Sequence, residues 1–145
     1  MQQFTPWWSR VLSYLIDWIL VGIPTSIADL IDPGNAALQI ALGLVSFALW
    51  VYNRCYLAGK GQSWGKMALG THLHSEATGR PIGTFKAFLR DLCHILDALP
   101  CYLGFLWPIW DDRRQTFADK IMSTVVTPVE TPLPEPVQPQ WPTTA

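Results

Sequence analysis

Two charged residues stand within an otherwise apolar stretch at the start of the sequence, WWSRVLSYLIDWILVGIP, which begins at Trp7. Arg10 and Asp17 are seven residues apart, so a helix would place them on one face, separated by about 10 Å along its axis. This separation is too large for the ion pairs that form between residues three or four positions apart. A charge in the middle of a membrane helix costs roughly 2.5–3.5 kcal/mol, so we expect Asp17 to bind a partner from elsewhere in the chain. Arg10 lies nearer the helix end and can also extend to the lipid headgroups.

A later segment repeats this arrangement of charges. RDLCHILD, which begins at Arg90, aligns with RVLSYLID, which begins at Arg10, either as a degenerate repeat or as two helices that converged on one solution. If the two helices pack antiparallel, Arg10 meets Asp97 and Arg90 meets Asp17, whereas a parallel packing would require a shift of about two turns. A carboxylate within about 4–6 Å of a guanidinium group stays ionised. The sequence therefore predicts a buried charge network, and a candidate transport path, formed by Arg10, Asp17, Arg90, Asp91, His94 and Asp97.

Other reactive side chains do not combine into a site. The three cysteines have no metal-type spacing, and His72 and His74 alternate along a solvated face of a predicted strand without a clear third ligand. The segment GKGQSWGKM lacks the first Gly and the Ser or Thr of a P-loop, so a turn that places Lys66 near anionic headgroups is the better interpretation. The sequence offers no set of nucleophile, general base and orienting residue that could form a catalytic site. We therefore expect no enzymatic activity, no metal and no cofactor.

The elements that must position these residues are those of an α-helical membrane protein. The chain has 145 residues, of which half are hydrophobic and only 14% are charged, against about 25% in soluble domains. Two apolar segments, 10–31 and 36–57, are each long enough to span a bilayer, which takes about 20 residues. A short polar turn separates them. The sequence therefore predicts a transmembrane hairpin of two helices.

A third apolar region covers residues 84–110. Its first part is amphipathic, with charged residues on one face, and its second part is interrupted by Pro100 and Pro108. The second part is short for a span of its own, and a crossing there would leave later arginines outside the cell. We favour a re-entrant or interfacial segment, with one kinked spanning helix over 84–110 as the alternative.

A small β element and an orientation complete the expected fold. The alternation in residues 70–75, the segment 81–83 after a turn and the β-branched run 123–127 indicate short strands. The simplest closure pairs 123–127 with 70–75, which requires both to lie on the cytoplasmic side. The turn at 29–35 has no Lys or Arg, whereas six lie between Arg54 and Arg90. The positive-inside rule therefore places this turn outside and the N-terminus in the cytoplasm.

Several spaced motifs resemble the RDD family of small bacterial integral membrane proteins, which is named for one Arg and two Asp. Arg10 and Asp17 match the first two positions, and Asp119 in DDRRQTFADKIMSTVV is the best match for the later Asp, with Asp97 as its rival. GQSWGK resembles the family's G-Q-T-x-G-K segment, and Ser123 stands where Gly is common, which predicts a less extreme φ. The residues that match family motifs are Arg10, Asp17, Gly61, Gln62, Gly65, Lys66, Arg114 and Asp119.

The resemblance covers residues 5–128 and implies one multi-pass domain in the bacterial inner (plasma) membrane, followed by a Pro-rich tail at 129–145 that we expect to be disordered. It also implies transport of an unidentified ion or small solute. Two or three helices cannot enclose a pathway, so transport would require a homo-oligomer or a membrane partner protein. The alternative is a membrane adaptor or assembly factor that binds a partner through its cytoplasmic face. The expected partners include the lipid bilayer but not nucleic acid, because the net charge is only −1.

Overall fold

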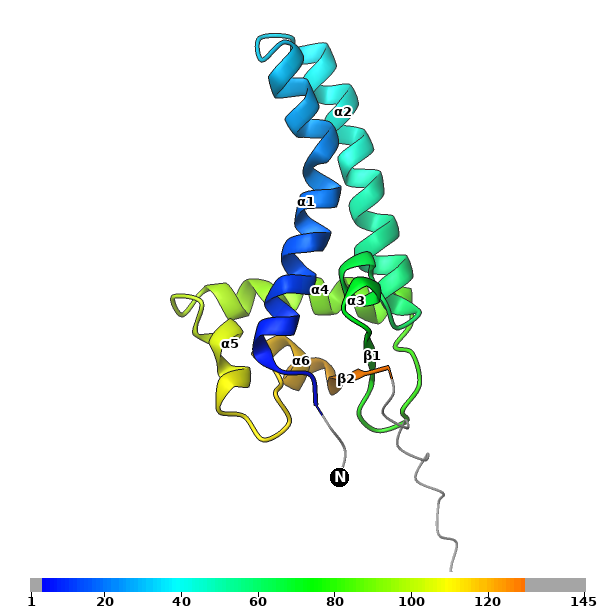
Figure 1. Cartoon of the computed structure of the whole chain (residues 1–145), viewed down its shortest axis with the longest axis vertical. Helices are drawn as coiled ribbons and strands as arrows, with labels where there is room; N and C mark the ends of the chain where they lie inside the picture. The colour runs from blue at the N-terminus through cyan, green and yellow to red at the C-terminus, as the bar shows by residue number, and fades with distance from the viewer. Residues whose placement is uncertain (1–3, 130–145) are drawn as a thin grey trace, which may run out of the picture.

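Two long apolar helices form an antiparallel hairpin in the computed structural model, which describes residues 4–129 (Figure 1). α1 (Trp7–Ile31) is followed by α2 (Ala36–Trp50), which continues into the π-helical segment η1 (Val51–Leu57). α1 and the continuous helix Ala36–Leu57 are long and apolar enough to cross a membrane. The turn between them ends at Asn35, whose side chain accepts a hydrogen bond from the backbone of Leu38 and so caps α2. The predicted hairpin is thus present.

The third apolar region is not one helix. α4 (Thr84–Ala98) ends before Pro100, and α5 (Leu103–Leu106) runs into the 3-10 turn η2 (Trp107–Ile109) at an angle of 106° to α4. Cys101 and Tyr102 both take positive φ values at the break, which ends the helical path. α4 lies across the base of the hairpin, and α5 turns away from it (Figure 1). This bent pair agrees with both expectations for 84–110, the re-entrant or interfacial segment and the kinked span.

A two-stranded antiparallel sheet lies at the end of the hairpin opposite the α1–α2 turn (Figure 1). β1 (Thr71–Ser75) pairs with β2 (Thr124–Pro128), which confirms the predicted pairing of 70–75 with 123–127. The strand expected at 81–83 is wrong. Pro81 has no N–H to donate, and the backbone N–H of Gly83 donates to Gly59 in the loop after η1 instead of to a strand.

Two short helices were not expected from the sequence. α3 (Trp64–Ala68) follows η1, and α6 (Phe117–Met122) precedes β2. α6 begins with a capping box, in which Thr116 and Asp119 exchange side-chain and backbone hydrogen bonds. It ends at Ser123, whose φ of 51° is left-handed, so the less extreme turn expected there is also wrong.

The small core beneath the hairpin joins these elements. Leu73 of β1 and Val126 of β2 pack with three more buried apolar residues, Ala58, Ile82 and Ala87. The N-terminal segment is tied to the same unit, because the backbone N–H of Thr5 donates to the carbonyl of Val126 at 3.0 Å. Apart from Val129, the tail expected to be disordered lies outside the described residues.

Candidate functional site

Asp17, in the middle of α1, is buried, and both of its carboxylate oxygens accept hydrogen bonds. Its Oδ1 accepts from Asn53 Nδ2 and from the backbone N–H of Gly65, both at 2.7 Å. Its Oδ2 accepts from Ser63 Oγ at 2.6 Å and from Arg54 Nη1 at 3.4 Å. Each carboxylate oxygen therefore has two donors, and all four come from η1 and the start of α3.

The local structure explains why these donors converge. The widened π-helical turn of η1 turns Asn53 and Arg54 toward α1, and such turns are frequent at functional sites. Asn53 Oδ1 also accepts from the backbone of Trp64 at 2.8 Å and so fixes the start of α3. Gly65 lets α3 lie directly against α1, because a Cβ at this position would overlap the carbonyl group of Ser13.

Arg54 joins the Asp17 cluster to α4. Its Nε and Nη2 donate to the carboxylate of Asp91, while its Nη1 donates to Asp17. The ring of Tyr14 lies against the guanidinium group, with 4.9 Å from Cζ to the ring centroid. One arginine at the end of the second long helix thereby links α1 and α4.

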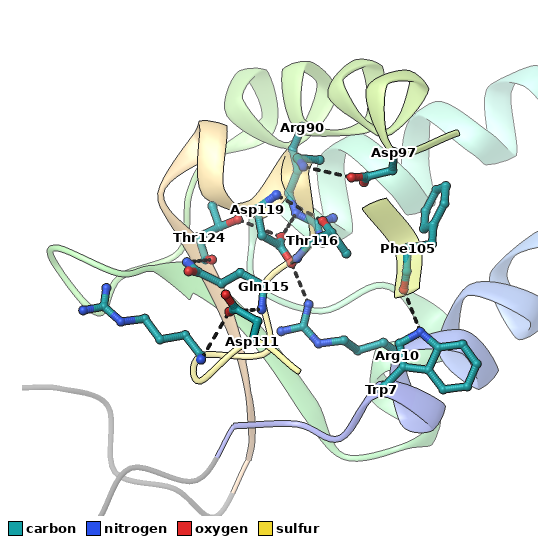
Figure 2. A network of polar contacts seen from close by, with 12 residues as sticks. Trp7, Arg10, Arg90, Asp97, Phe105, Asp111, Gln115, Thr116, Asp119 and Thr124 are labelled. Carbon is teal, nitrogen blue, oxygen red and sulfur yellow. Dashed lines mark hydrogen bonds and ion pairs between the residues drawn. The ribbon is translucent and has the colours of Figure 1, made fainter. Parts of the chain in front are cut away.

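A second cluster is centred on Asp119 in α6 (Figure 2). Arg10 Nη1 donates to Oδ2 at 2.6 Å. Arg90 Nε donates to Oδ1 at 2.7 Å, and Arg90 Nη2 forms an ion pair with the same oxygen at 2.7 Å. Thr124 Oγ1 adds a hydrogen bond of 2.9 Å to Oδ1. Burial alone would raise the pKa of Asp119, but the guanidinium groups of Arg90 and Arg10 outweigh it and hold this pKa well below its ordinary value.

A third cluster involves the last residues of α4. Asp97 is buried and lies 2.5 Å from His94 Nδ1 through its Oδ2, while its Oδ1 accepts from the backbone of Ala118 at 3.3 Å. Gly104 packs so closely on Asp97 that a Cβ there would overlap it. Asp97 thus fastens α4 to both α5 and α6.

These contacts correct the predicted pairing. Arg10 does not meet Asp97 and Arg90 does not meet Asp17, because α4 crosses α1 at the base of the hairpin instead of packing antiparallel to it. Both arginines share Asp119. All six residues of the predicted network are nevertheless charged or polar members of the three neighbouring clusters, and four of them lie on α4.

Sequence reasoning missed the residues that complete these clusters. Arg54 was used only to orient the chain, although a charge at the end of an apolar helix was a signal for a buried partner. Asn53, Ser63 and Thr124 are ordinary polar residues in sequence, and only the fold brings them to a carboxylate. Of the two candidates for the later aspartate, Asp119 is the one that pairs with Arg10.

The other residues that match family motifs shape the backbone near the clusters. Gly61 has a φ of 111° and its carbonyl accepts from the backbone of Leu73, while Gln62 Nε2 donates to the carbonyl of Thr71 at 3.1 Å. Arg114 takes a positive φ in the turn that leads into α6. Lys66 differs from them, because its buried side chain faces the space beside the charged clusters.

A cavity of about 290 Å³ lies between α1, α4 and α5. Five basic side chains contribute to its wall: Arg10, Arg54, Lys66, Arg90 and His94. Burial, together with the nearby guanidinium groups of Arg90 and Arg54, lowers the pKa of Lys66 to about 7. The cavity is therefore a candidate binding site that is lined by ionisable side chains.

The strand histidines lie elsewhere. His74 is buried against β2, contrary to the solvated face expected, and burial lowers the pKa of both His74 and His72. Within residues 4–129, no group of three or more His, Cys, Asp or Glu side chains could hold a metal ion.

Comparison with known proteins gives the relationship of the chain. The model of the RDD family matches residues 4–123, which include every arginine and aspartate of the three clusters. The chain belongs to the RDD family. Among curated relatives it is 37% identical to a proline-rich antigen homolog of Mycobacterium tuberculosis and 36% identical to a proline-rich antigen of Mycobacterium leprae, over 88% of the chain in each case. It covers only 65% and 62% of those proteins. No solved structure matches this RDD-family chain.

Proposed function

We propose that this RDD-family protein acts in the bacterial inner (plasma) membrane, with a cytoplasmic N-terminus, and takes part in the transport of an ion or small solute without enzymatic activity. The observation that supports transport is the cavity of about 290 Å³ beside α1, because its wall carries five basic side chains in a protein whose outer helices are apolar. Such a cavity can receive a polar solute that the bilayer excludes.

A single chain does not provide enough helices to surround a pathway. The described residues contain two long spanning helices and one bent pair. Their outer faces are strongly apolar, with Trp18 69% and Leu30 86% exposed, so lipid or further protein must cover them. We therefore propose a homo-oligomer, or a complex with a membrane partner protein, as the working form.

One observation favours the alternative function of a membrane adaptor or assembly factor. Asp17 has four fixed donors and Asp119 has three side-chain donors, so neither carboxylate has a free position for a passing ion. In this case the clusters only lock the helices together, and the cytoplasmic face around the sheet and α6 binds a partner.

Measurements of oligomeric state and flux distinguish the two functions. The protein is sized in mild detergent and then reconstituted into liposomes that contain a pH-sensitive dye or radiolabelled solutes. Transport predicts an oligomer and a flux that protein-free liposomes lack. Asp17→Asn should abolish this flux, because it loosens the contact between η1, α3 and α1. Asp29→Asn, at an exposed position in the last turn of α1, should preserve it. A monomer without flux for any ion or solute tested would overturn the transport function and leave the adaptor.

A further inference from the structure

Within residues 4–129, the cavity beside α1 is lined by basic side chains without acidic ones. Arg10, Arg54, Lys66, Arg90 and His94 all line it, whereas none of the Asp or Glu residues that the structure describes does so. The carboxylates that pair with these arginines, Asp17, Asp91 and Asp119, are not part of this wall. The described charged side chains that a solute would meet in the cavity are therefore all basic.

Several donors in this wall have no acceptor within the protein. Arg10 uses only Nη1 for Asp119, and its Nε and Nη2 are buried without a hydrogen-bond partner. Lys66 is only 7% exposed, and no ion pair reaches its Nζ within the described part of the chain. Buried donors without acceptors are costly, so we expect another molecule to supply the acceptors in the native protein.

The charged groups that face Lys66 do not supply an acceptor for its ammonium group. Arg54 and Arg90 oppose its charge, while Asp17 and Asp119 favour it. Both carboxylates, however, are already occupied by the arginines and by fixed hydrogen bonds. Water could accept from Lys66 but would bring no negative charge. An anion would supply Lys66 with both an acceptor and a negative charge.

The rest of the wall indicates what kind of anion fits. Trp7, Val11, Leu15, Phe105 and Pro108 form the apolar side of the wall. Several guanidinium and ammonium donors that converge from different elements suit the many oxygens of a phosphate group, and the apolar side suits a carbon-based remainder. We propose that this cavity binds a phosphate-bearing anion, with Lys66 as its principal donor.

This inference rests on the proposed transport function in one respect, because it names the chemical class of solute for the same cavity. Binding can nevertheless occur without flux, so the two proposals can fail separately. The phosphate group can come from a small soluble phosphate ester or from the headgroup of an anionic lipid. Two arms of one experiment separate these sources. Glycerol 3-phosphate and inorganic phosphate serve as soluble probes, with glycerol as the neutral control, and phosphatidic acid in phosphatidylcholine nanodiscs serves as the lipid probe.

The test compares the intact protein with Lys66→Met and with Lys86→Met. Lys86 is an exposed lysine on α4 outside the cavity, so its replacement makes the same change of charge at the same end of the hairpin. Soluble binding is measured by calorimetry on lipid-stripped protein, and lipid binding by native mass spectrometry from nanodiscs. We expect Lys66→Met to weaken binding about tenfold or more, and Lys86→Met to leave it unchanged.

The outcomes separate the possibilities. Binding of the soluble probes that depends on Lys66 assigns the site to a soluble phosphate ester, and binding of phosphatidic acid alone assigns it to a lipid headgroup. Equal binding by wild type and Lys66→Met, or binding of neither kind of probe, would overturn the site. Lys66-dependent binding in a protein without flux would keep the site and reject transport.

A measurement on the wild type covers the case in which Lys66→Met does not fold. At pH 8.5 most Lys66 is neutral in the empty cavity, because its pKa is about 7. A bound anion restores the ammonium form, so binding should take up about one proton per site, detected by calorimetry in buffers with different ionisation enthalpies. Binding without proton uptake would show that Lys66 is not a ligand.

Discussion

Asp17 shows at the residue scale how a carboxylate can be held inside a membrane protein. Its four donors all come from residues 53–65, so removal of its charge should weaken the whole contact between α1 and the segment after α2. Asp17→Asn leaves Arg54 with only Asp91 and turns an amide N–H₂ toward other donors. Breaking a buried pair in this way costs about 3–5 kcal/mol, which lowers the midpoint of thermal unfolding by on the order of 10 °C.

Thermal unfolding of the protein in mild detergent measures this loss. Asp29→Asn is the matched control, because Asp29 is exposed in the last turn of α1 and accepts a single hydrogen bond from Gln39. Equal midpoints for the two variants would contradict the role of Asp17. The contacts also imply that Arg90→Asp cannot rescue Asp17→Arg, since Arg90 pairs with Asp119.

Lys66 gives a second prediction at this scale, on the dependence of stability on pH. Its pKa in the folded protein is about 7, below the value of 10.5 for a free lysine. Between these values the unfolded chain binds more protons than the folded one, so the stability of the ligand-free protein should rise with pH from about 7 to about 10 and stay flat below 7. The rise amounts to at most about 4 kcal/mol.

Chemical or thermal unfolding between pH 6 and about 10 measures this slope. In Lys66→Met the rise should be lost, because Met does not titrate, whereas Lys86→Met should keep it. A slope that survives in Lys66→Met would assign it to another group.

At the element scale, the short helix α3 depends on one glycine. A Cβ on Gly65 would overlap the carbonyl of Ser13 in α1, and any shift of α3 would also break the 2.7 Å hydrogen bond from Gly65 to Asp17. We expect Gly65→Ala to destabilise the fold by several kcal/mol. Gly43→Ala in α2 is the control: its Cβ would meet no atom, so it should be neutral or stabilising by about 0.5–1 kcal/mol.

Unfolding midpoints of the two variants in detergent test this difference. Since both replacements add one methyl group to a helix, a similar midpoint for both would mean that α3 does not pack on α1 as described.

The elements also show how far the sequence could predict the fold. The long apolar runs and the strand at 70–75 carry strong periodic signals, and the hairpin and the β1–β2 pairing follow from them. α3 and α6 are shorter than two helical turns, so no period could reveal them. The helical charges were identified as buried, but their partners depend on the angle at which α4 crosses α1, and the sequence carries no signal for that angle.

The site was predictable to a similar extent. Arg10 and Asp17 stand out because charges are rare in apolar helices, and the segment around Lys66 stands out through its glycines. Arg54 was concealed by its second role as a positive charge near a membrane surface. The cavity could not be predicted, because its wall joins residues from α1, α3, α4 and α5 that are distant in sequence.

At the scale of the whole molecule, the sheet fixes how often the chain can cross a membrane. β1 follows the second long helix and β2 follows the bent pair, yet the two strands pair along their whole length. Both ends of the segment between them must then lie on the same side of the membrane. Thr5 bonds to Val126, so the start of α1 lies on that side as well. We therefore predict that the chain crosses the membrane twice, and that α4 with α5 enters it only part of the way or lies on its surface.

Labelling of Cys101 tests this topology directly. Cys101 is exposed at the bend between α4 and α5, whereas Cys55 is buried, so a variant with Cys55→Ser and Cys93→Ser leaves one informative thiol. A membrane-impermeant maleimide should not reach Cys101 from the side of the α1–α2 turn in intact cells, while a cysteine placed at Gly34 in that turn should react. A reporter fused after Thr127 should lie on the side of the N-terminus, because β2 cannot pair with β1 across a bilayer. Labelling of Cys101 together with the Gly34 position would mean that the bent pair crosses, and the sheet could then not form in the membrane-inserted protein.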